Sequence, residues 1–100
     1  MSLRFEWDRL KASRNLRKHH VSFDEASTVF YNPLARIFED ENHSDNEIRE
    51  LIIGDSAASR LLIVSFTERQ IESQPNLIRI ISARQATTRE RADYEENQRY

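Results

Sequence analysis

Two apolar runs that carry charged residues constrain the fold of this chain more than any other feature. Residues 60–68 and 77–84 have the length and the apolar spacing of β-strands; Glu68 closes the first run, and Arg79 and Arg84 interrupt the second. An arginine inside an isoleucine-rich strand must reach solvent, a carboxylate or a phosphate. The pattern therefore predicts a sheet that bears a charged site, with Arg79 and Arg84 as candidate anion ligands.

Helical patterns flank these strands on both sides. Asp8 is placed to cap a first helix that runs to about His19, and a capping box of Ser22 and Glu25 opens a second helix that ends before Pro33. The other predicted elements are strands at 34–39 and 48–54, a turn at 69–76, and a last helix from a second capping box at 87–90 to about residue 97. The expected fold class is α+β in the order ααββββα, with the helices on one face of a four-stranded antiparallel sheet.

The length and the hydrophobic content fit one small domain over residues 1–100. The chain has no cysteine, which excludes thiol chemistry. No apolar run approaches the ~20 residues of a membrane span and the first residues lack a signal-peptide pattern, so we expect a cytoplasmic protein. The formal charge of −2 is uneven, with a net +3 over residues 1–38, −6 over 39–58 and +1 over 59–100. Thirteen of the fifteen basic residues are arginine, which suits phosphate or carboxylate partners, although a surface of solvated ion pairs also explains the composition.

Several short motifs, in order along nearly the whole chain, resemble those of a known family. They are Phe5-Glu6-Trp7-Asp8, Asn15-Leu16-Arg17-Lys18-His19, Val21-Ser22-Phe23-Asp24-Glu25-Ala26, His43-Ser44, Arg60-Leu61-Leu62, Phe66-Thr67-Glu68-Arg69, Ile78-Arg79-Ile80-Ile81-Ser82-Ala83-Arg84 and Ala86-Thr87. The family is BrnT, whose members are toxins of type II toxin–antitoxin systems. Two departures are His20, where the family usually has glycine, and the segment 69–76, which is longer than the usual hairpin.

The resemblance implies a RelE-like fold and a ribonuclease that cleaves mRNA, free or on the ribosome, and so inhibits translation. It implies a cognate BrnA-type antitoxin as partner, in a 2:2 complex, and contact with operator DNA only through that antitoxin. It implies no cofactor and no membrane. A different class of function stays open, namely a non-catalytic RNA- or protein-binding module derived from such a toxin.

RNA cleavage without a metal needs a base for the 2′-hydroxyl proton, cations for the charge that develops on the phosphate, and an acid for the leaving oxygen. We predict Glu68 as the base and Arg79 with Arg84 as the phosphate-binding cations. His19 is a candidate acid or base near neutral pH. Further candidates for RNA contact are Lys18, Arg69 and Tyr94, the last by stacking on a base or by donating a proton.

Each candidate also has a structural explanation. Glu68 and Arg69 fit an ordinary pair at a strand end, and His19 fits a helix end favoured by the macrodipole. Arg79 and Arg84 are five residues apart, so they project from opposite faces of a regular strand and share a site only if the strand bulges or twists. If the strand is regular, Arg84 lies outside the site and instead fixes the last helix or binds the antitoxin.

The acidic segment around His43 invites interpretation as a metal site. Hard-metal loops need a fixed ligand geometry and usually a glycine turn, and this segment has no glycine. We therefore predict no metal site.

Overall fold

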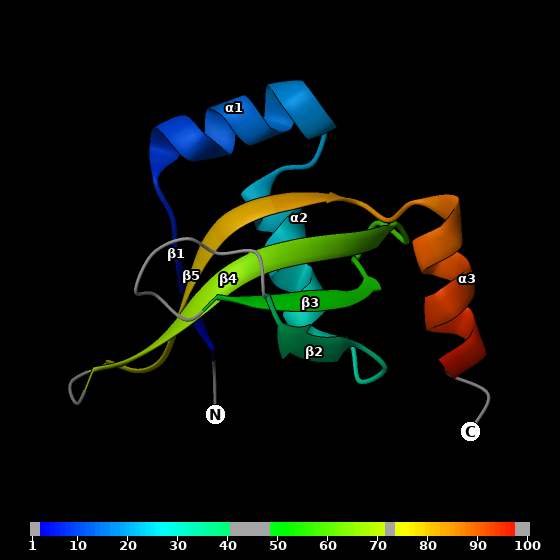
Figure 1. The fold of residues 1–100 in the computed structure, drawn as a ribbon. Helices are drawn as coiled ribbons and strands as arrows, with labels where there is room; N and C mark the ends of the chain where they lie inside the picture. The colour runs from blue at the N-terminus through cyan, green and yellow to red at the C-terminus, as the bar shows by residue number, and fades with distance from the viewer. Residues whose placement is uncertain (1–2, 41–48, 72–73, 98–100) are drawn as a thin grey trace.

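The computed structural model describes residues 3–40, 49–71 and 74–97 (Figure 1). Helices occupy both ends of the chain, and the strands of one sheet lie mainly between them. In chain order the elements are β1 (Arg4–Glu6), α1 (Arg9–His19), α2 (Phe23–Thr28), the 3₁₀ turn η1 (Val29–Tyr31), β2 (Arg36–Glu39), β3 (Glu50–Asp55), β4 (Leu61–Ile71), β5 (Gln74–Gln85) and α3 (Thr88–Asn97).

The described strands form one five-stranded sheet in the order β1-β5-β4-β3-β2. Strands β2 to β5 are an antiparallel meander, as predicted, but β1 adds a fifth strand parallel to β5, with Arg4 opposite Leu77. The predicted order ααββββα and the four-stranded, wholly antiparallel sheet are therefore wrong. β1 has three residues and its partner lies at the other end of the chain, so no local pattern indicates it. The predicted turn is also too long, because β4 runs to Ile71 and β5 begins at Gln74.

A bulge interrupts the pairing of the two central strands. Ser65 lies opposite Ser82, but the next residue of β4, Phe66, lies opposite Ile80, so Ile81 is an extra residue in β5. A bulge of this kind changes which side chains face each side of the sheet, since the alternation restarts beyond the extra residue. This shift decides the geometry of the site described below.

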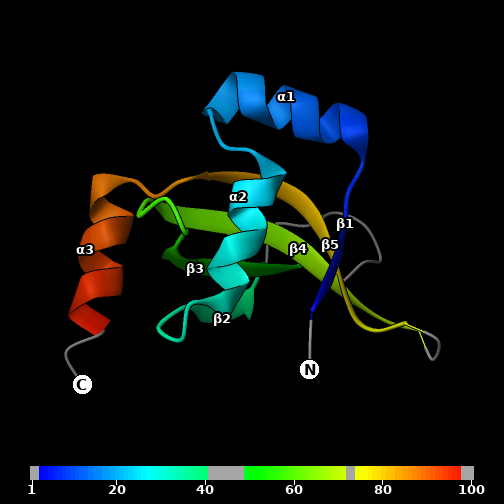
Figure 2. The ribbon, with the colours of Figure 1, turned by 180° about the vertical axis from the view of Figure 1, so that it is seen from behind.

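The main core lies on the face of the sheet that α1 and α2 cover, and α2 crosses this face in Figure 2. Phe66 and Phe23 are almost completely buried there, and Phe30 packs edge-to-face on Phe66 with ring centroids 4.9 Å apart. The buried members of this core are Val21, Phe23, Ala26, Val29, Ile52, Leu62, Val64, Phe66, Ile78, Ile80 and Ala83.

The helix starts follow the sequence. Asp8 caps α1 by accepting hydrogen bonds from the amides of Leu10 and Lys11 at 2.8 and 3.0 Å. At α3 the capping box is complete, because the Thr87 hydroxyl accepts from the Glu90 amide and the Glu90 carboxylate accepts from the Thr87 amide. These predictions are confirmed, and they depend only on residues two or three positions apart.

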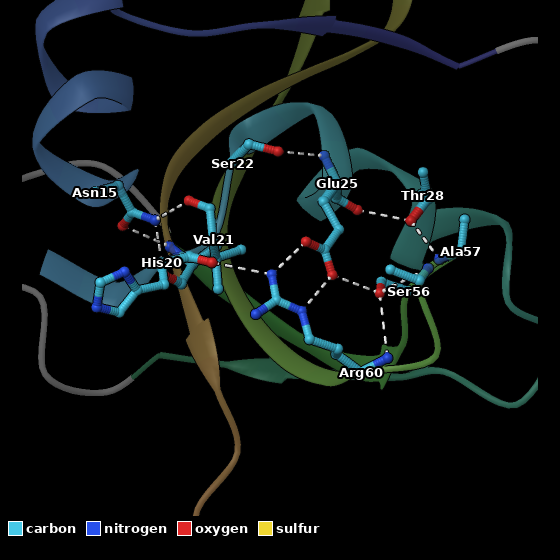
Figure 3. A network of polar contacts seen from close by, with 11 residues as sticks. Asn15, His20, Val21, Ser22, Glu25, Thr28, Ser56, Ala57 and Arg60 are labelled. Atoms are coloured by element: carbon cyan, nitrogen blue, oxygen red, sulfur yellow. Dashed lines mark hydrogen bonds and ion pairs between the residues drawn. The ribbon is translucent and has the colours of Figure 1, made fainter. Parts of the chain in front are cut away.

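The capping box predicted for α2 is only half formed. Ser22 Oγ accepts from the Glu25 amide at 3.0 Å, but the Glu25 carboxylate turns to Arg60 and Ser56 (Figure 3). Arg60 Nη2 also donates to the carbonyl of His20 at 3.0 Å. One carboxylate therefore ties α2 to the β3–β4 connection and, through Arg60, to the end of α1.

The last helix packs on the opposite face of the sheet from α1 and α2. Tyr94 is buried there with Ile53, Leu61 and Ile63, and its hydroxyl donates to the carbonyl of Leu34 at 2.9 Å. The prediction that all helices cover one face is wrong. Tyr94 and Ala92 are the only apolar residues in α3, so the helix has no apolar stripe from which its packing could be predicted. No helix in the described ranges has the length and apolar character needed to cross a membrane.

Candidate active site

A buried asparagine fixes the end of α1 against the sheet. The Asn15 side chain donates to the carbonyls of Val21 and Ala83 at 2.9 and 2.8 Å and accepts from the Ala83 amide at 3.0 Å. Ala83 lies in β5 just beyond the bulge. Because Asn15 is only 7% exposed, this three-bond contact is shielded from competing water. The last turn of α1 is thereby held over β5.

Helix α1 ends at His19, and His20 is its C-cap residue. His20 adopts a left-handed conformation with φ 58°, and its amide donates to the carbonyl of Leu16 at 2.9 Å. Glycine takes this conformation without cost, whereas a residue with a Cβ does not, as expected from the departure of this chain at His20. The C-cap at His20 and the three hydrogen bonds of the Asn15 side chain, which we call the Asn15 clamp, together fix His19 beside the sheet.

His19 lines a small hollow on the sheet face opposite the main core. The hollow has a volume of about 90 Å³. Its polar lining residues are His19, Ser65, Ser82 and Arg84. Its other lining residues are Leu51, Ile63 and Ala83. We call this the His19 hollow.

The bulge places the two strand arginines on one face. Arg84 lies opposite Ile63, and Arg79 lies opposite Thr67; both β4 residues belong to the face of the His19 hollow. Without the extra Ile81, the spacing of five would send the two guanidinium groups to opposite faces. The condition set by the sequence, that β5 must bulge for both arginines to share a face, is met.

The predicted pair of Glu68 and Arg79 is not brought together. Glu68 lies opposite Ile78, which belongs to the main core, so its side chain leaves the sheet on the face away from Arg79. Glu68 itself is exposed, beyond the end of that core. The carboxylate and the guanidinium are therefore separated by the thickness of the sheet.

Arg79 and Arg84 each form an ion pair with a carboxylate. Arg84 makes a two-pronged contact with Glu90, at 2.8 and 2.9 Å, and this contact lowers the pKa of Glu90 to about 2. Arg79 Nη1 lies 3.1 Å from the carboxylate of Glu6 in β1. The pairs are partly exposed, so the guanidinium groups are oriented by their partners and still reach solvent. The alternative that Arg84 fixes the last helix agrees with this contact.

The remaining predicted RNA ligands differ in their surroundings. Lys18 is exposed on the last turn of α1, next to His19. Tyr94 is buried, and its hydroxyl is bonded to the backbone, so the ring serves the packing of α3. Burial raises the pKa of the Tyr94 phenol, which opposes its ionisation. Arg69 lies in β4 opposite Leu77, and its side chain falls outside the described part of the chain.

The segment around His43 lies outside the described residues. Within residues 3–40, 49–71 and 74–97, no three His, Cys, Asp or Glu side chains come close enough together to hold a metal ion.

Sequence reasoning missed Asn15, Ser65 and Ser82. The two serines interrupt apolar runs in the same way as the arginines do, and this was the signal that could have marked them. Asn15 gives a weaker signal, because a polar residue within a polar helix draws no attention until its burial is known.

The fold and the hollow define a small α+β protein with a cationic, histidine-lined site on one face of its sheet. A family model described as the ribonuclease toxin BrnT of type II toxin–antitoxin systems matches residues 7–90. The chain therefore belongs to the BrnT family of ribonuclease toxins, and the resemblance in its motifs is confirmed.

A solved structure supports the fold. The crystal structure of the Brucella abortus ribonuclease toxin BrnT, at 1.1 Å resolution, superposes with a TM-score of 0.61. The sequences are 21% identical, and the match covers 87% of this chain and all of that one. No match was found among curated proteins.

Proposed function

We propose that this chain is an active endoribonuclease that needs no metal, cleaves mRNA and so inhibits translation in the cytoplasm. The observation that carries the proposal is the His19 hollow, which a histidine, an arginine and two serines line together. These are the group types that phosphodiester cleavage by the neighbouring 2′-hydroxyl requires. The five-stranded α+β fold is compatible with the RelE-like class implied by the motifs.

In this proposal His19 replaces Glu68 as the general base. The imidazole takes the proton of the 2′-hydroxyl, the 2′-oxygen forms a bond to phosphorus, and the bond to the 5′-oxygen breaks. The departing oxygen receives a proton from the imidazolium or from water. Neutral imidazole accepts a proton readily near pH 7, which suits it to both transfers.

Arg84 and the serines stabilise the charge that develops on the phosphate. The two-pronged contact with Glu90 fixes the Arg84 guanidinium at the edge of the hollow before RNA binds, so little reorganisation is needed during the reaction. Ser65 and Ser82 have hydroxyl donors for the non-bridging oxygens. Arg79, further along the same face, is suited to the next phosphate of the strand.

Membership of the family implies an antitoxin. We infer a BrnA-type protein encoded beside this chain, which binds it in a 2:2 complex and carries the contact with operator DNA. Recognition of mRNA free in solution or on the ribosome is compatible with a site on the open face of a small domain.

The test is to map mRNA ends in a bacterial cell-free translation extract. Wild-type protein should produce new ends and stop translation, and His19→Ala should reduce the cleavage rate by ~10²- to 10⁴-fold. Glu68→Ala is the matched control, because Glu68 is exposed on the other face, and it should cleave within a few-fold of wild type. Cleavage that survives His19→Ala and is lost in Glu68→Ala would return the base to the residue predicted from sequence.

A second candidate function is a non-catalytic RNA-binding module. The observation in its favour is the run of exposed basic residues on α1, Lys11, Arg14 and Lys18. It predicts RNA binding that weakens steeply with salt, because phosphate contacts release counterions, and intact mRNA in the same extract.

A further inference from the structure

The last strand of the sheet is an open edge. Among the residues that the structure describes, β2 pairs with β3 only, and all four residues of β2 are exposed. The two middle residues are large and apolar, with Ile37 55% and Phe38 47% exposed. An exposed edge strand with apolar side chains is a template for pairing with another chain, and proteins that do not use such an edge usually protect it.

The backbone of β2 presents free donors and acceptors along this edge. The Asp40 amide donates to the Arg49 carbonyl at 2.9 Å, so this pair is of the hydrogen-bonded type. In an antiparallel pair the two types alternate, so the pair of Phe38 with Leu51 is also hydrogen-bonded. The amides and carbonyls of Ile37 and Glu39 therefore point away from β3.

An apolar hollow adjoins the edge. It has a volume of about 470 Å³ and lies between β2 and α3, with Phe38, Leu51, Ile53, Ile63 and Tyr94 among its lining residues. Leu51, Ile63 and Arg84 line this hollow and the His19 hollow alike. Side chains that enter this hollow therefore contact residues that also line the candidate active site.

The charges around the edge favour a basic protein over RNA. Among the described charged residues of this edge and of the apolar hollow, four are acidic and two are basic, namely Glu39, Glu50, Glu90 and Asp93 against Arg36 and Arg84. Glu39 lies directly opposite Glu50 at the end of β2, and Asp93 and Glu90 stand on the α3 side of the hollow. A phosphate backbone is repelled by such a surface, whereas lysine or arginine side chains are attracted to it.

We propose that β2 is the docking edge for the antitoxin, and that an extended antitoxin segment with alternating apolar residues and with lysine or arginine adds to the sheet as a sixth strand. Main-chain hydrogen bonds to Ile37 and Glu39 supply affinity, and the apolar hollow receives side chains that specify the partner. The inference rests on the proposed function, because it needs a toxin that an antitoxin binds. Side chains of the added segment that enter the apolar hollow would contact Leu51, Ile63 and Arg84, which also line the His19 hollow, and this contact is the proposed route of neutralisation.

The sharpest test removes one outward backbone donor of β2. Glu39→Pro deletes an outward N–H without breaking a bond to β3, and proline is tolerated at such edge positions. Glu39→Gln is the control, because it removes the same charge and keeps the N–H. With the purified small basic protein encoded beside this chain as the probe, calorimetry should show about tenfold weaker binding for Glu39→Pro relative to Glu39→Gln. Equal affinities would overturn the proposal.

A second pair of variants tests the apolar side chains. Ile37→Lys combined with Phe38→Lys places positive charge against a basic segment and should weaken binding roughly 100-fold. Leu10→Lys is the matched control, since Leu10 is 67% exposed on α1, away from β2, and it should bind like wild type. The reverse order of affinities would move the interface to α1.

Hydrogen exchange on the wild-type complex keeps the proposal falsifiable if a variant does not fold. The amides of Ile37 and Glu39 should gain protection when the antitoxin binds, and that of Phe38 should change less because it is already bonded to β3. Protection that appears elsewhere and leaves these two amides unchanged would overturn the docking edge.

The two proposals can fail separately. A wild-type protein that leaves mRNA intact but binds the probe through β2 would lose the nuclease function and keep the docking edge. A wild-type protein that cleaves mRNA, and whose Glu39→Pro variant binds the probe normally, would do the reverse. A probe that does not bind wild-type protein at all would overturn the docking edge directly.

Discussion

The two faces of the sheet use the same strands for different purposes. On the face under α1 and α2, eleven described side chains form a continuous buried core, whereas on the face toward α3 four do. The second face contains Ser65, Ser82 and the strand arginines. It also contains the apolar hollow beside α3 and the His19 hollow. One face supplies most of the stability, and the other is left free to carry polar groups that a core would not tolerate.

The contrast predicts that aromatic residues on the two sides differ greatly in their contribution to stability. Phe66→Ala empties a fully buried site in the main core and should lower the free energy of unfolding by about 4 kcal/mol. Phe38→Ala, at the exposed edge, should cost about 1 kcal/mol or less. Urea denaturation of both variants measures the difference, and similar losses would remove the distinction between the faces.

The three hydrogen bonds of Asn15 join α1 to β5 beside His19, so their loss should affect both stability and the candidate site. Asn15→Ala leaves the Ala83 amide and two carbonyls without their partner and should cost about 3 kcal/mol. Because the clamp also fixes His19, mRNA cleavage should fall even at temperatures where the variant is folded. Arg14→Ala, one residue earlier and exposed, is the control. A variant that loses stability but cleaves at the wild-type rate would show that His19 is positioned independently of Asn15.

The packed face should reject even a single added methyl group. Gly54 is the only glycine in the chain, and a Cβ there would lie 2.8 Å from the Cβ of Ala35 and 3.2 Å from Cγ1 of Val29. Gly54→Ala should therefore destabilise the protein by about 2 kcal/mol through overpacking. Thermal unfolding measures this, with the exposed Ala58→Ser as control. An unchanged midpoint would mean that Ala35 moves aside at little cost.

On the face toward α3, the contribution of Glu90 to the stability of the folded state should depend on pH. Its pKa is lowered from 4.5 to about 2, mainly by Arg84, so ionised Glu90 stabilises the folded state above about pH 4.5 and loses this effect as the pH falls toward 2. Glu90→Gln should be less stable than wild type at pH 7, by less than about 1 kcal/mol because the pair is partly exposed. Denaturation at several pH values should show the difference vanish by pH 2. A difference independent of pH would assign the effect to packing.

The sequence predicted the features that depend on neighbouring residues. The caps at Asp8, Ser22 and Thr87 follow from residues within one helical turn, and the meander follows from alternation within each strand. β1 and the packing of Tyr94 escaped prediction because each depends on a partner far along the chain.

The candidate site was predicted in composition but not in geometry. His19, Arg79 and Arg84 were singled out from the sequence, and the structure brings His19 and Arg84 to one hollow. Glu68 was paired with Arg79, but the register sets Thr67 opposite Arg79, and a difference of one residue changes the face on which a side chain lies. Register and bulges are set by packing across the whole sheet, so a local pattern does not determine them.

The parallel pairing of β1 with β5 has a consequence for how the protein is made. Glu6 and Arg79 are 73 residues apart, and Asn15 and Ala83 are 68 apart, so neither contact forms before β5 has been synthesised. Contacts of this separation form late in folding. A nascent chain therefore lacks the clamp that fixes His19 until β5 has emerged. This topology therefore makes the geometry of the candidate site depend on the synthesis of β5.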